Sequence, residues 1–343
     1  MKVAQDAAGR FASRLLQSAG AEPDDADVVA RALVDAERLG QGGHGLARLP
    51  GYVGRLQAGG TVSGGWQLVH AAGSVEAYDG RAGLGHVHLR RAVQRAAHLC
   101  EGDGLGLVGV ANSNHGGALG VHARGLADAG LVSVLMTNGP AVIAPPGGRE
   151  AVLGTNPIAL AAPVPDGPPL VCDLATSQVS RGQIMRAAQE GRPIPPGWAL
   201  DSEGTPTEDA PAALSGTLMP LGGPKGFALA LAVEVLTGVL LGPAVGPEVA
   251  DFFGESLDRP QGIAHLVLAI DPSAVGGRAG FDARMARLCA AVLDSGDGAT
   301  RLPGSLAIAR AAQHEATLDV GSGLLDQLER LADELAVERI VPL

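Results

Sequence analysis

The spacing of apolar residues changes near residue 74, and this change is the strongest constraint on the fold. In the first part of the chain, apolar residues recur at helical spacing. This spacing predicts three helices, over Val3 to Ser18, Ala21 to Leu39 and His44 to Leu56. From Ser74 onward the apolar runs become short and are flanked by Gly, Asn and Pro, as is typical of strands joined by turns.

Six of the short runs have the length and composition of strands: Ser74 to Tyr78, Leu105 to Ala111, Leu131 to Met136, Pro157 to Pro163, Leu170 to Asp173 and His265 to Ile270. Helices are expected between several of them, over Val87 to Leu99 and Gly117 to Ala129. We therefore expect an α/β protein with a helical N-terminal domain over residues 1–72. A mixed α/β domain should occupy residues 73–295, and helices within residues 296–343 should pack on the first domain.

One dinucleotide-binding fingerprint occurs in this part, as Gly104-Leu-Gly106-Leu-Val-Gly109. The mechanism of that motif requires a strand before it and a helix after it. Here the glycines lead into the expected strand Leu105 to Ala111 instead. If a dinucleotide binds, it binds on something other than a Rossmann turn.

Composition excludes several classes of function. The formal net charge is −11 and no cluster of Lys and Arg stands out, which argues against a nucleic-acid surface. The N-terminus has no signal-peptide pattern, and the most hydrophobic stretch, Phe227 to Leu241, is too short to cross a bilayer. A cytoplasmic protein is expected. The three cysteines are far apart and form no CxxC pair, so neither disulfides nor a cysteine metal site is indicated.

Lysine occurs only twice, as Lys2 and as Lys225, whereas the chain has 23 arginines (25 Lys and Arg less two Lys). Pro224 suits the first turn of a helix over Phe227 to Leu241, so Lys225 lies where a helix favours anions. A cation there costs roughly a few tenths of a kcal/mol unless an anion binds beside it. Lys225 and the N–H groups after Gly222-Gly223 are therefore candidates for holding a phosphorylated cofactor. The alternative is a solvated surface lysine.

His44 and Arg48 are four residues apart, which on a helix places an imidazole and a guanidinium on one face. Histidine can transfer a proton near neutral pH, and arginine can hold a carboxylate through two parallel hydrogen bonds. The pair suits an acid catalyst beside a carboxylate anchor. The alternative is a surface pair without a role.

Three loops at strand ends carry further polar residues. Asn112-Ser-Asn-His115 follows one strand and precedes a helix, where free N–H groups can meet an anion or His115 can serve as a cap. The loops Gly154-Thr-Asn-Pro157 and Asp173-Leu-Ala-Thr-Ser177 can line a ligand cleft or simply turn the chain. His86 and His88 have no acidic or cysteine partner nearby and are interpreted as structural, so no metal site is expected.

Together these segments resemble the malate/L-lactate dehydrogenase family, which also contains sulfolactate, ureidoglycolate and diketogulonate oxidoreductases and cyclic ketimine reductases. The resemblance covers nearly the whole chain. The motifs that carry it are His44-Gly-Leu-Ala-Arg48, Asn112-Ser-Asn-His115, Pro145-Pro-Gly-Gly148, Gly154-Thr-Asn-Pro157, Asp173-Leu-Ala-Thr-Ser177, Gly222-Gly-Pro-Lys-Gly226, Ala269-Ile-Asp-Pro272 and Arg301-Leu-Pro-Gly304.

The resemblance implies a non-Rossmann NAD(P)-binding domain beside a helical domain, in a homodimer with the active site between the domains. It makes His44 the proton donor to a substrate carbonyl or imine and Arg48 the anchor of the substrate carboxylate. Thr155 is expected to contact the substrate. The positions implied to bind NAD or NADP are His115, Asp173, Leu174, Ala175, Thr176, Ser177, Lys225, Gly226 and Gly304. At His115 a role in proton transfer is the alternative to cofactor contact.

Four positions depart from the family pattern: Gly43 replaces a serine, Gln183 an Asp or Lys, Pro224 a histidine and Ser305 a glutamate. In the ketimine reductases that Ser and Asp form a relay with the histidine, so this chain lacks those helpers. The leading hypothesis is NAD(P)H-dependent reduction of a 2-oxo acid or of a cyclic or N-substituted 2-imino acid. The alternative is a catalytically impaired member that serves as a binding or assembly subunit. The sequence leaves open oxo against imino substrates, NAD against NADP, and the physiological direction.

Overall fold

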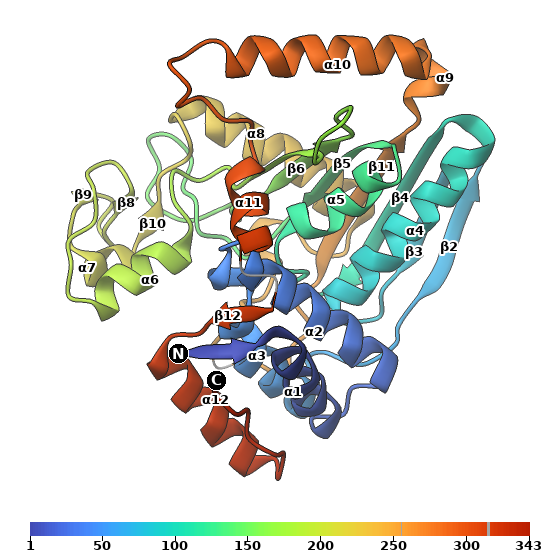
Figure 1. The fold of residues 1–343 in the computed structure, drawn as a ribbon. Helices are drawn as coiled ribbons and strands as arrows, with labels where there is room; N and C mark the ends of the chain where they lie inside the picture. The colour runs from blue at the N-terminus through green and yellow to red at the C-terminus, as the bar shows by residue number, and fades with distance from the viewer. Residues whose placement is uncertain (255, 314–315) are drawn as a thin grey trace.

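A seven-stranded mixed sheet forms the centre of the molecule (Figure 1). The structure is a computed structural model that describes residues 1–254, 256–313 and 316–343. The strand order is β2-β3-β4-β11-β5-β6-β7, in which only β3 and β4 pair in parallel. The bounds are β2 Gln67–Ala72, β3 Val75–Asp79, β4 Leu105–Ser113, β5 Val132–Thr137, β6 Ile158–Ala162, β7 Leu170–Leu174 and β11 Ile263–Ile270.

The six strands expected from the sequence are all present, as β3, β4, β5, β6, β7 and β11. β2 was not expected, because its six residues are all exposed and show no buried alternate face. The Gly-rich run at Gly104 ends α4 and begins β4, which confirms that it is not a Rossmann turn.

Helices cover both faces of the sheet. On one face, α4 (Gly85–Asp103) and α5 (Leu119–Asp128) bury Leu89, Leu119 and Leu126 against inward side chains of the strands, among them Val108. On the other face, α8 (Pro224–Glu234) continues into a π-helical turn, η3 (Val235–Val239). A Cβ atom on Gly109 of β4 would come within 2.5 Å of Leu241, so this glycine admits the end of that helix.

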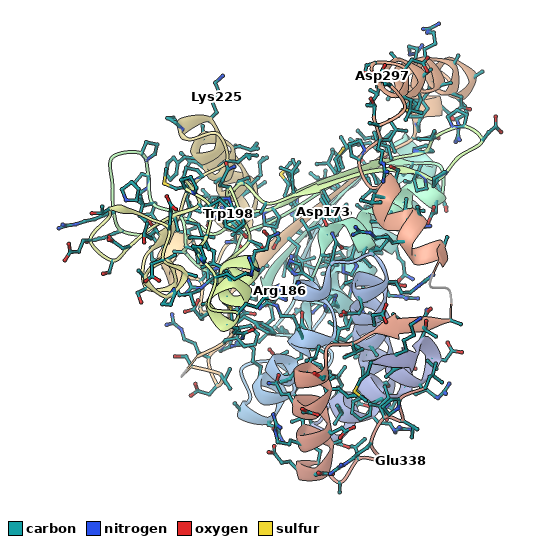
Figure 2. All side chains as sticks on the ribbon, turned by 60° about the vertical axis from the view of Figure 1, so that its left-hand side comes forward. Asp173, Arg186, Trp198, Lys225, Asp297 and Glu338 are labelled. Carbon is teal, nitrogen blue, oxygen red and sulfur yellow. The ribbon has the colours of Figure 1, made fainter. Side chains whose placement is uncertain are left out.

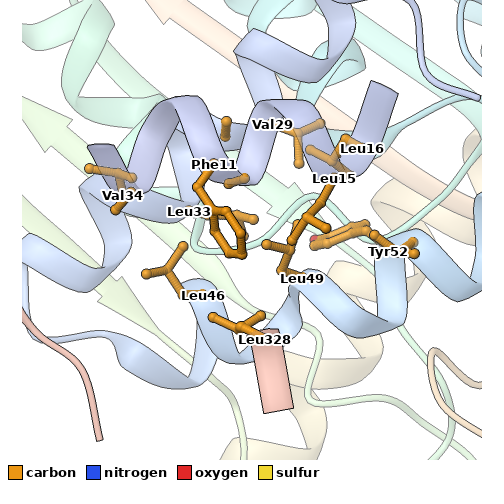
Figure 3. Packing of buried hydrophobic residues seen from close by; sticks show 14 of the residues in the cluster. Phe11, Leu15, Leu16, Val29, Leu33, Val34, Leu46, Leu49, Tyr52 and Leu328 are labelled. Carbon is orange, nitrogen blue, oxygen red and sulfur yellow. The ribbon is translucent and has the colours of Figure 1, made fainter. Parts of the chain in front are cut away.

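A separate helical core lies below the sheet (Figure 3). α1 (Gln5–Ser18), α2 (Pro23–Arg38) and α3 (Leu49–Ala58) pack together with α12 (Ser322–Glu334) from the other end of the chain. Lys2–Ala4 is strand β1, paired with β12 (Thr317–Asp319), so the helix expected from Val3 begins later, at Gln5. The mixed α/β fold with a helical N-terminal part is confirmed.

The helix expected over His44 to Leu56 is wrong in its first half. The chain forms two 3-10 turns, η1 (Gly42–His44) and η2 (Leu46–Arg48), before α3 begins at Leu49. Gly45 separates the turns with an extended ψ of −143°, which a continuous helix cannot contain. Pro50 then occupies the first turn of α3, where its missing N–H costs nothing.

The remaining elements form a small lobe beside the sheet and a C-terminal segment that crosses back over the molecule (Figure 1). The lobe holds β8 Ala199–Leu200, β9 Pro206–Thr207, β10 Thr217–Leu218, α6 Arg181–Gln189 and α7 Ala210–Leu214. The turn η4 Gly246–Glu248 precedes β11, and α9 Pro272–Gly276, α10 Arg278–Leu293 and α11 Ser305–Gln313 follow it. Among the described residues no helix is both long and apolar enough to cross a membrane.

The division expected between residues 72 and 73 stays a prediction. β2 ends at Ala72 and pairs with β3 in the large sheet, which places this strand with the α/β part rather than with the helices. At the other end of the chain, α12 contributes Leu325 and Leu328 to the helical core.

Candidate active site

His44 and Arg48 lie together where the 3-10 turns meet the sheet. Arg48 donates from Nε to the carbonyl of Gly43 at 2.7 Å, a hydrogen bond that spans both turns. Its guanidinium carbon lies 5.4 Å from the ring centre of Phe252 and 4.9 Å from that of Phe253. A guanidinium over aromatic faces is held by its charge while its remaining N–H groups stay free to bind an anion.

Arg55 positions the loop that carries these two aromatic rings. This arginine is fully buried, and it donates to the carbonyls of Asp251 at 3.1 Å and Arg259 at 2.5 Å. Gly51 lets α3 approach the same loop, since a Cβ atom there would lie 2.4 Å from the Phe252 ring. The wall beside Arg48 is therefore fixed by α3.

His115 stacks on His44, with ring centres 5.7 Å apart and planes 10° from parallel. Its Nδ1 lies 2.7 Å from the hydroxyl of Tyr52, which also packs edge-on against Phe252. Two rings with ionisable nitrogens thus face one space beside Arg48. This arrangement suits a polar double bond next to a carboxylate.

Burial and the positive charge of Arg48 determine the protonation state of both rings. Burial, with a smaller contribution from Arg48, lowers the pKa of His44 to about 4. The same two causes lower the pKa of His115 well below its ordinary value. Both rings are therefore neutral near pH 7 in the free protein. Nδ1 of His44 is buried and has no hydrogen-bond partner among the described residues.

A cavity of about 220 Å³ has in its lining Gln41, whose carbonyl accepts a hydrogen bond from the backbone N–H of His44. It lies between the end of α2, α5, β7 and α11, and its lining includes Gln41, Asp173 and Gly304. Asp173 accepts hydrogen bonds from Gln41 at 3.3 Å and from the backbone N–H of Gly120 at 2.9 Å. Burial raises the pKa of this carboxyl. Oε1 of Gln41 is also buried without a partner among the described residues, so one residue of the cavity lining carries an unsatisfied acceptor.

The other expected site residues lie along one connected path from β7 to α8. Thr176 donates from both its N–H and its hydroxyl to the carbonyl of Thr155, and its own carbonyl accepts from Leu221. Ser177 pairs with Pro220 in an isolated bridge. Leu174 and Ala175 lead into this segment, with Leu174 39% exposed. Gly226 is buried against Leu221, where a Cβ atom would lie 2.1 Å from a carbonyl oxygen.

Lys225 is exposed at the first turn of α8 and makes no hydrogen bond or ion pair with the described residues. Figure 2 shows its side chain pointing away from the body of the molecule, whereas Asp173 lies near the centre. Pro224, the neighbour of Lys225, lines a larger cavity of about 730 Å³ together with Arg149, Gly204 and Met219. The structure thus does not bring Lys225 to the His44 ring.

Gly43 and Gln183, two of the positions that depart from the family pattern, form no hydrogen-bonded relay with His44 among the described residues. Gly43 is exposed, and a Cβ atom on it would meet no heavy atom of the described residues within 4 Å. Gln183 is exposed on α6 and its side chain makes no hydrogen bond with the described residues. His44 therefore has no side-chain helper from either position.

Sequence reasoning missed four contributors to the site: Tyr52, His86, Phe252 and Phe253. His86 was interpreted as structural, yet its Nε2 lies 3.0 Å from the Tyr52 hydroxyl that contacts His115. The aromatic residues give no local motif, and they reach the site only through tertiary packing. His88 instead bonds Ser113 and the carbonyl of Gly65, in keeping with a structural role.

The chain is similar to known proteins over nearly its whole length. The malate/L-lactate dehydrogenase family profile matches residues 3–329. The chain is 40% identical to a (2R)-3-sulfolactate dehydrogenase (NADP(+)) of Chromohalobacter salexigens, over 92% of this chain and 94% of that protein. It is 35% identical to a Delta(1)-pyrroline-2-carboxylate/Delta(1)-piperideine-2-carboxylate reductase of Pseudomonas aeruginosa, over 88% and 90% respectively. The solved structure of a sulfolactate dehydrogenase from Methanocaldococcus jannaschii superposes with a TM-score of 0.91 at 29% identity, covering 98% of each chain.

The buried histidines predict a loss of stability in mild acid. Burial lowers the pKa to about 4 for His44, His88 and His122 and to about 3 for His265, whereas an unfolded chain has ordinary values near 6.5. As the pH falls from 6.5 toward about 5, the unfolded state binds more protons, so the free energy of unfolding decreases. Each ring contributes a slope that approaches about 1 kcal/mol per pH unit. Urea unfolding across this window measures the slope.

The variant His88→Asn serves as the control for this stability loss. It removes one buried ring that does not contact His44 or His115. The slope of the free energy of unfolding against pH should therefore decrease by the contribution of one histidine. A slope that is the same in the variant and the parent contradicts the assignment.

Proposed function

The chain belongs to the malate/L-lactate dehydrogenase family, and we propose that it reduces a 2-oxo acid, or a cyclic or N-substituted 2-imino acid, with NAD(P)H. One observation carries the proposal. Arg48 has no carboxylate partner among the described residues, and it lies beside His44, whose buried Nδ1 is also unpartnered there. The names of the relatives support it, because sulfolactate and pyrroline-2-carboxylate both carry a carboxylate next to the reacting carbon.

Arg48 would bind the substrate carboxylate and thereby fix the carbon that is reduced. Burial of the guanidinium between Phe252 and Phe253 lowers its pKa, which means that it is poorly solvated and gains from meeting an anion. The two rings exclude water from this ion pair. A carboxylate held here places the neighbouring C=O or C=N beside the stacked rings of His44 and His115.

His44 would donate the proton that the reduction consumes. In the free protein its pKa of about 4 leaves it neutral, for which Arg48 is partly responsible. A bound carboxylate cancels the charge of Arg48, which is the smaller of the two causes, so it should raise the pKa of His44 from its low value. The ring would then take up a proton from solvent when substrate binds and give it to the oxygen or nitrogen.

The cofactor would be held along the path from Asp173 to Ser177, by Gly226 and Gly304, and by Lys225. When bound, NAD(P)H supplies the hydride. The fit is supported by the cavity at Asp173 and by the buried, unpartnered Oε1 of Gln41. Lys225 would contact a phosphate or ribose group at the exposed end of α8, where the helix N-terminus also favours an anion.

A homodimer would cover the exposed apolar surface of α8 and η3 and the exposed helix α10, at the same end of the molecule (Figures 1 and 2). α8 and η3 expose Leu231, Val235 and Val239 at 47%, 48% and 62%, and Leu240, directly after η3, is 62% exposed. Cys289 is the only residue of α10 that is buried. Soluble monomers rarely leave such continuous apolar surface in water. A second copy of the chain is the occupant that the family membership favours.

Substitutions at the two proposed catalytic positions should have different kinetic effects. His44→Ala should lower kcat by about 10² to 10⁴-fold, because the proton donor is lost. Arg48→Ala should mainly raise KM, by about 30-fold or more, because the anchor is lost. Arg10→Ala on the exposed face of α1 is the control. Steady-state oxidation of NADH and NADPH with 2-oxo and cyclic 2-imino acids measures these effects.

If His44→Ala retains full activity, His44 is not the donor. Absence of turnover by the parent chain with every such acid would instead favour the alternative of a binding or assembly subunit. The open space at Gly43 and the exposed position of Gln183 are the observations behind that alternative.

Lys225→Ala should weaken cofactor binding about 5- to 10-fold without changing the thermal midpoint, since the side chain is exposed and makes no hydrogen bond or ion pair with the described residues. Fluorescence titration with NADH and NADPH measures the dissociation constants. Lys2→Ala, at the only other lysine, is the matched control. Equal affinities for Lys225→Ala and Lys2→Ala would remove Lys225 from the cofactor site.

The double substitution Val239→Glu, Leu240→Glu should produce a folded monomer, because it places charges in the proposed interface. Light scattering after size-exclusion chromatography measures the mass. Val341→Glu, at a position that is 74% exposed, should leave the dimer intact. A parent chain that is monomeric at every concentration tested refutes the interface.

A further inference from the structure

Four buried or half-buried rings form one hydrogen-bonded row that ends at the candidate active site. His122 of α5 lies 3.3 Å from His86 of α4, between Nε2 and Nδ1. His86 Nε2 lies 3.0 Å from the hydroxyl of Tyr52 on α3, and that hydroxyl lies 2.7 Å from Nδ1 of His115. The proposed reaction assigns no role to Tyr52, His86 or His122.

A backbone carbonyl at the His122 end of the row determines which nitrogen donates in each hydrogen bond. His122 Nε2 lies 3.1 Å from the carbonyl oxygen of Gly116, which can only accept, so this nitrogen carries the proton. His86 Nδ1, which faces the same N–H, must then be the acceptor. Burial lowers the pKa of His86 well below its ordinary value, so the ring is neutral and its single proton is on Nε2.

Donors and acceptors can be assigned in the same way from His86 through Tyr52 to His115. His86 donates from Nε2 to the Tyr52 oxygen, and burial raises the pKa of Tyr52, so the phenol keeps its own proton. That proton is donated to Nδ1 of His115 at 2.7 Å, which is shorter than the 3.4 Å from the hydroxyl to the His115 carbonyl. Nδ1 of His115 is therefore an acceptor, and the neutral ring carries its proton on Nε2.

We propose that Tyr52, His86 and His122 are positioning residues that hold His115 in the Nε2–H tautomer, so that His115 donates a hydrogen bond to the carbonyl oxygen or imine nitrogen of the substrate. The proposal rests on the proposed function and deepens it. It gives His115 a contact to substrate in place of the cofactor contact that the family resemblance implied.

The position of His115 fits this role. Its ring is only half-buried and is stacked on His44, so both rings border the space beside Arg48. Nε2 has no hydrogen-bond partner in the part of the chain that the structure describes, whereas Nδ1 is occupied by Tyr52. A neutral N–H donor already aimed at the place where negative charge develops stabilises the transition state without reorganisation.

His44 and His115 would then have different roles, since His44 transfers a proton and His115 donates a fixed hydrogen bond. His44, with an unpartnered Nδ1, can change its protonation state when the substrate carboxylate meets Arg48. His115 cannot do so without breaking the row, because its Nδ1 is already the acceptor of a hydrogen bond. The row therefore keeps the second ring as a fixed donor beside a ring that titrates.

The test combines nitrogen NMR of ¹⁵N-histidine-labelled full-length protein with steady-state kinetics. In the parent chain the His115 signals, identified by their loss in His115→Asn, should show a protonated Nε2. In Tyr52→Phe the acceptor constraint is lost, so the signals should shift toward a mixture of tautomers. We expect kcat for a 2-oxo acid to fall by about 10- to 100-fold, with KM changed by less than about threefold.

Two further variants separate the tautomer effect from a packing defect. His86→Leu removes the donor to Tyr52 and should reproduce both changes. His86→Gln keeps one donor and one acceptor, so it should recover most of the activity and the Nε2–H signal. Tyr78→Phe, which removes a buried hydroxyl that donates to Glu76 away from the site, is the control and should change neither readout.

Each outcome has a distinct meaning. A His115 ring whose tautomer is the same in the parent chain, Tyr52→Phe and His86→Leu overturns the positioning role. A changed tautomer with unchanged kcat overturns the hydrogen bond to substrate. If the parent chain turns over no acid at all, the proposed function fails, while the NMR spectra still decide whether the row fixes the tautomer.

Discussion

The buried face of α3 joins the three parts of the molecule on which the candidate site depends. Tyr52 packs in the helical core, touches Phe252 and hydrogen-bonds His115. One turn later, Arg55 is fully buried and donates to the backbone carbonyls of Asp251 and Arg259. A buried arginine is stable only when its N–H groups are satisfied, so the loop and the helix fix each other. The wall behind Arg48 is a consequence of this packing.

Electrostatics then gives the cluster its chemistry. Arg48, His44 and His115 are close together and partly buried, and no described carboxylate neutralises the guanidinium. The protein therefore keeps the two rings neutral and the arginine poorly solvated, a state that a substrate carboxylate relieves. Binding and protonation are linked in this account. Under the proposed function, the cluster selects an acid whose carboxylate is next to the reacting carbon.

The sequence was sufficient for the parts of the fold that have strong local patterns. The six expected strands carry apolar runs bounded by Gly, Asn or Pro, and all six are present in the sheet. β2 was missed because all its residues are exposed, and the helix over His44 to Leu56 was wrong because Gly45 interrupts it. In both places tertiary contacts, rather than local spacing, decide the conformation.

The candidate site was predictable only where residues are neighbours in sequence. His44 and Arg48 were paired from helical spacing, but no helix forms there, and two 3-10 turns bring them together instead. Tyr52 and Phe252 are 200 positions apart and meet through packing alone. Lys225 stood out by composition, which says nothing about where its side chain points. The network from His122 to His115 likewise needs the positions of α3, α4 and α5, which no motif encodes.

The central claim is hydride transfer to the carbon next to a carboxylate that Arg48 holds. It is tested most directly with NAD(P)H that carries deuterium at the transferable position of the nicotinamide, followed by mass spectrometry of the reduced acid. The account predicts deuterium on the carbon beside the carboxylate in the product of the parent chain, and loss of that labelled product in Arg48→Ala at the same substrate concentration. Label at another carbon, or undiminished labelling in Arg48→Ala, would contradict it.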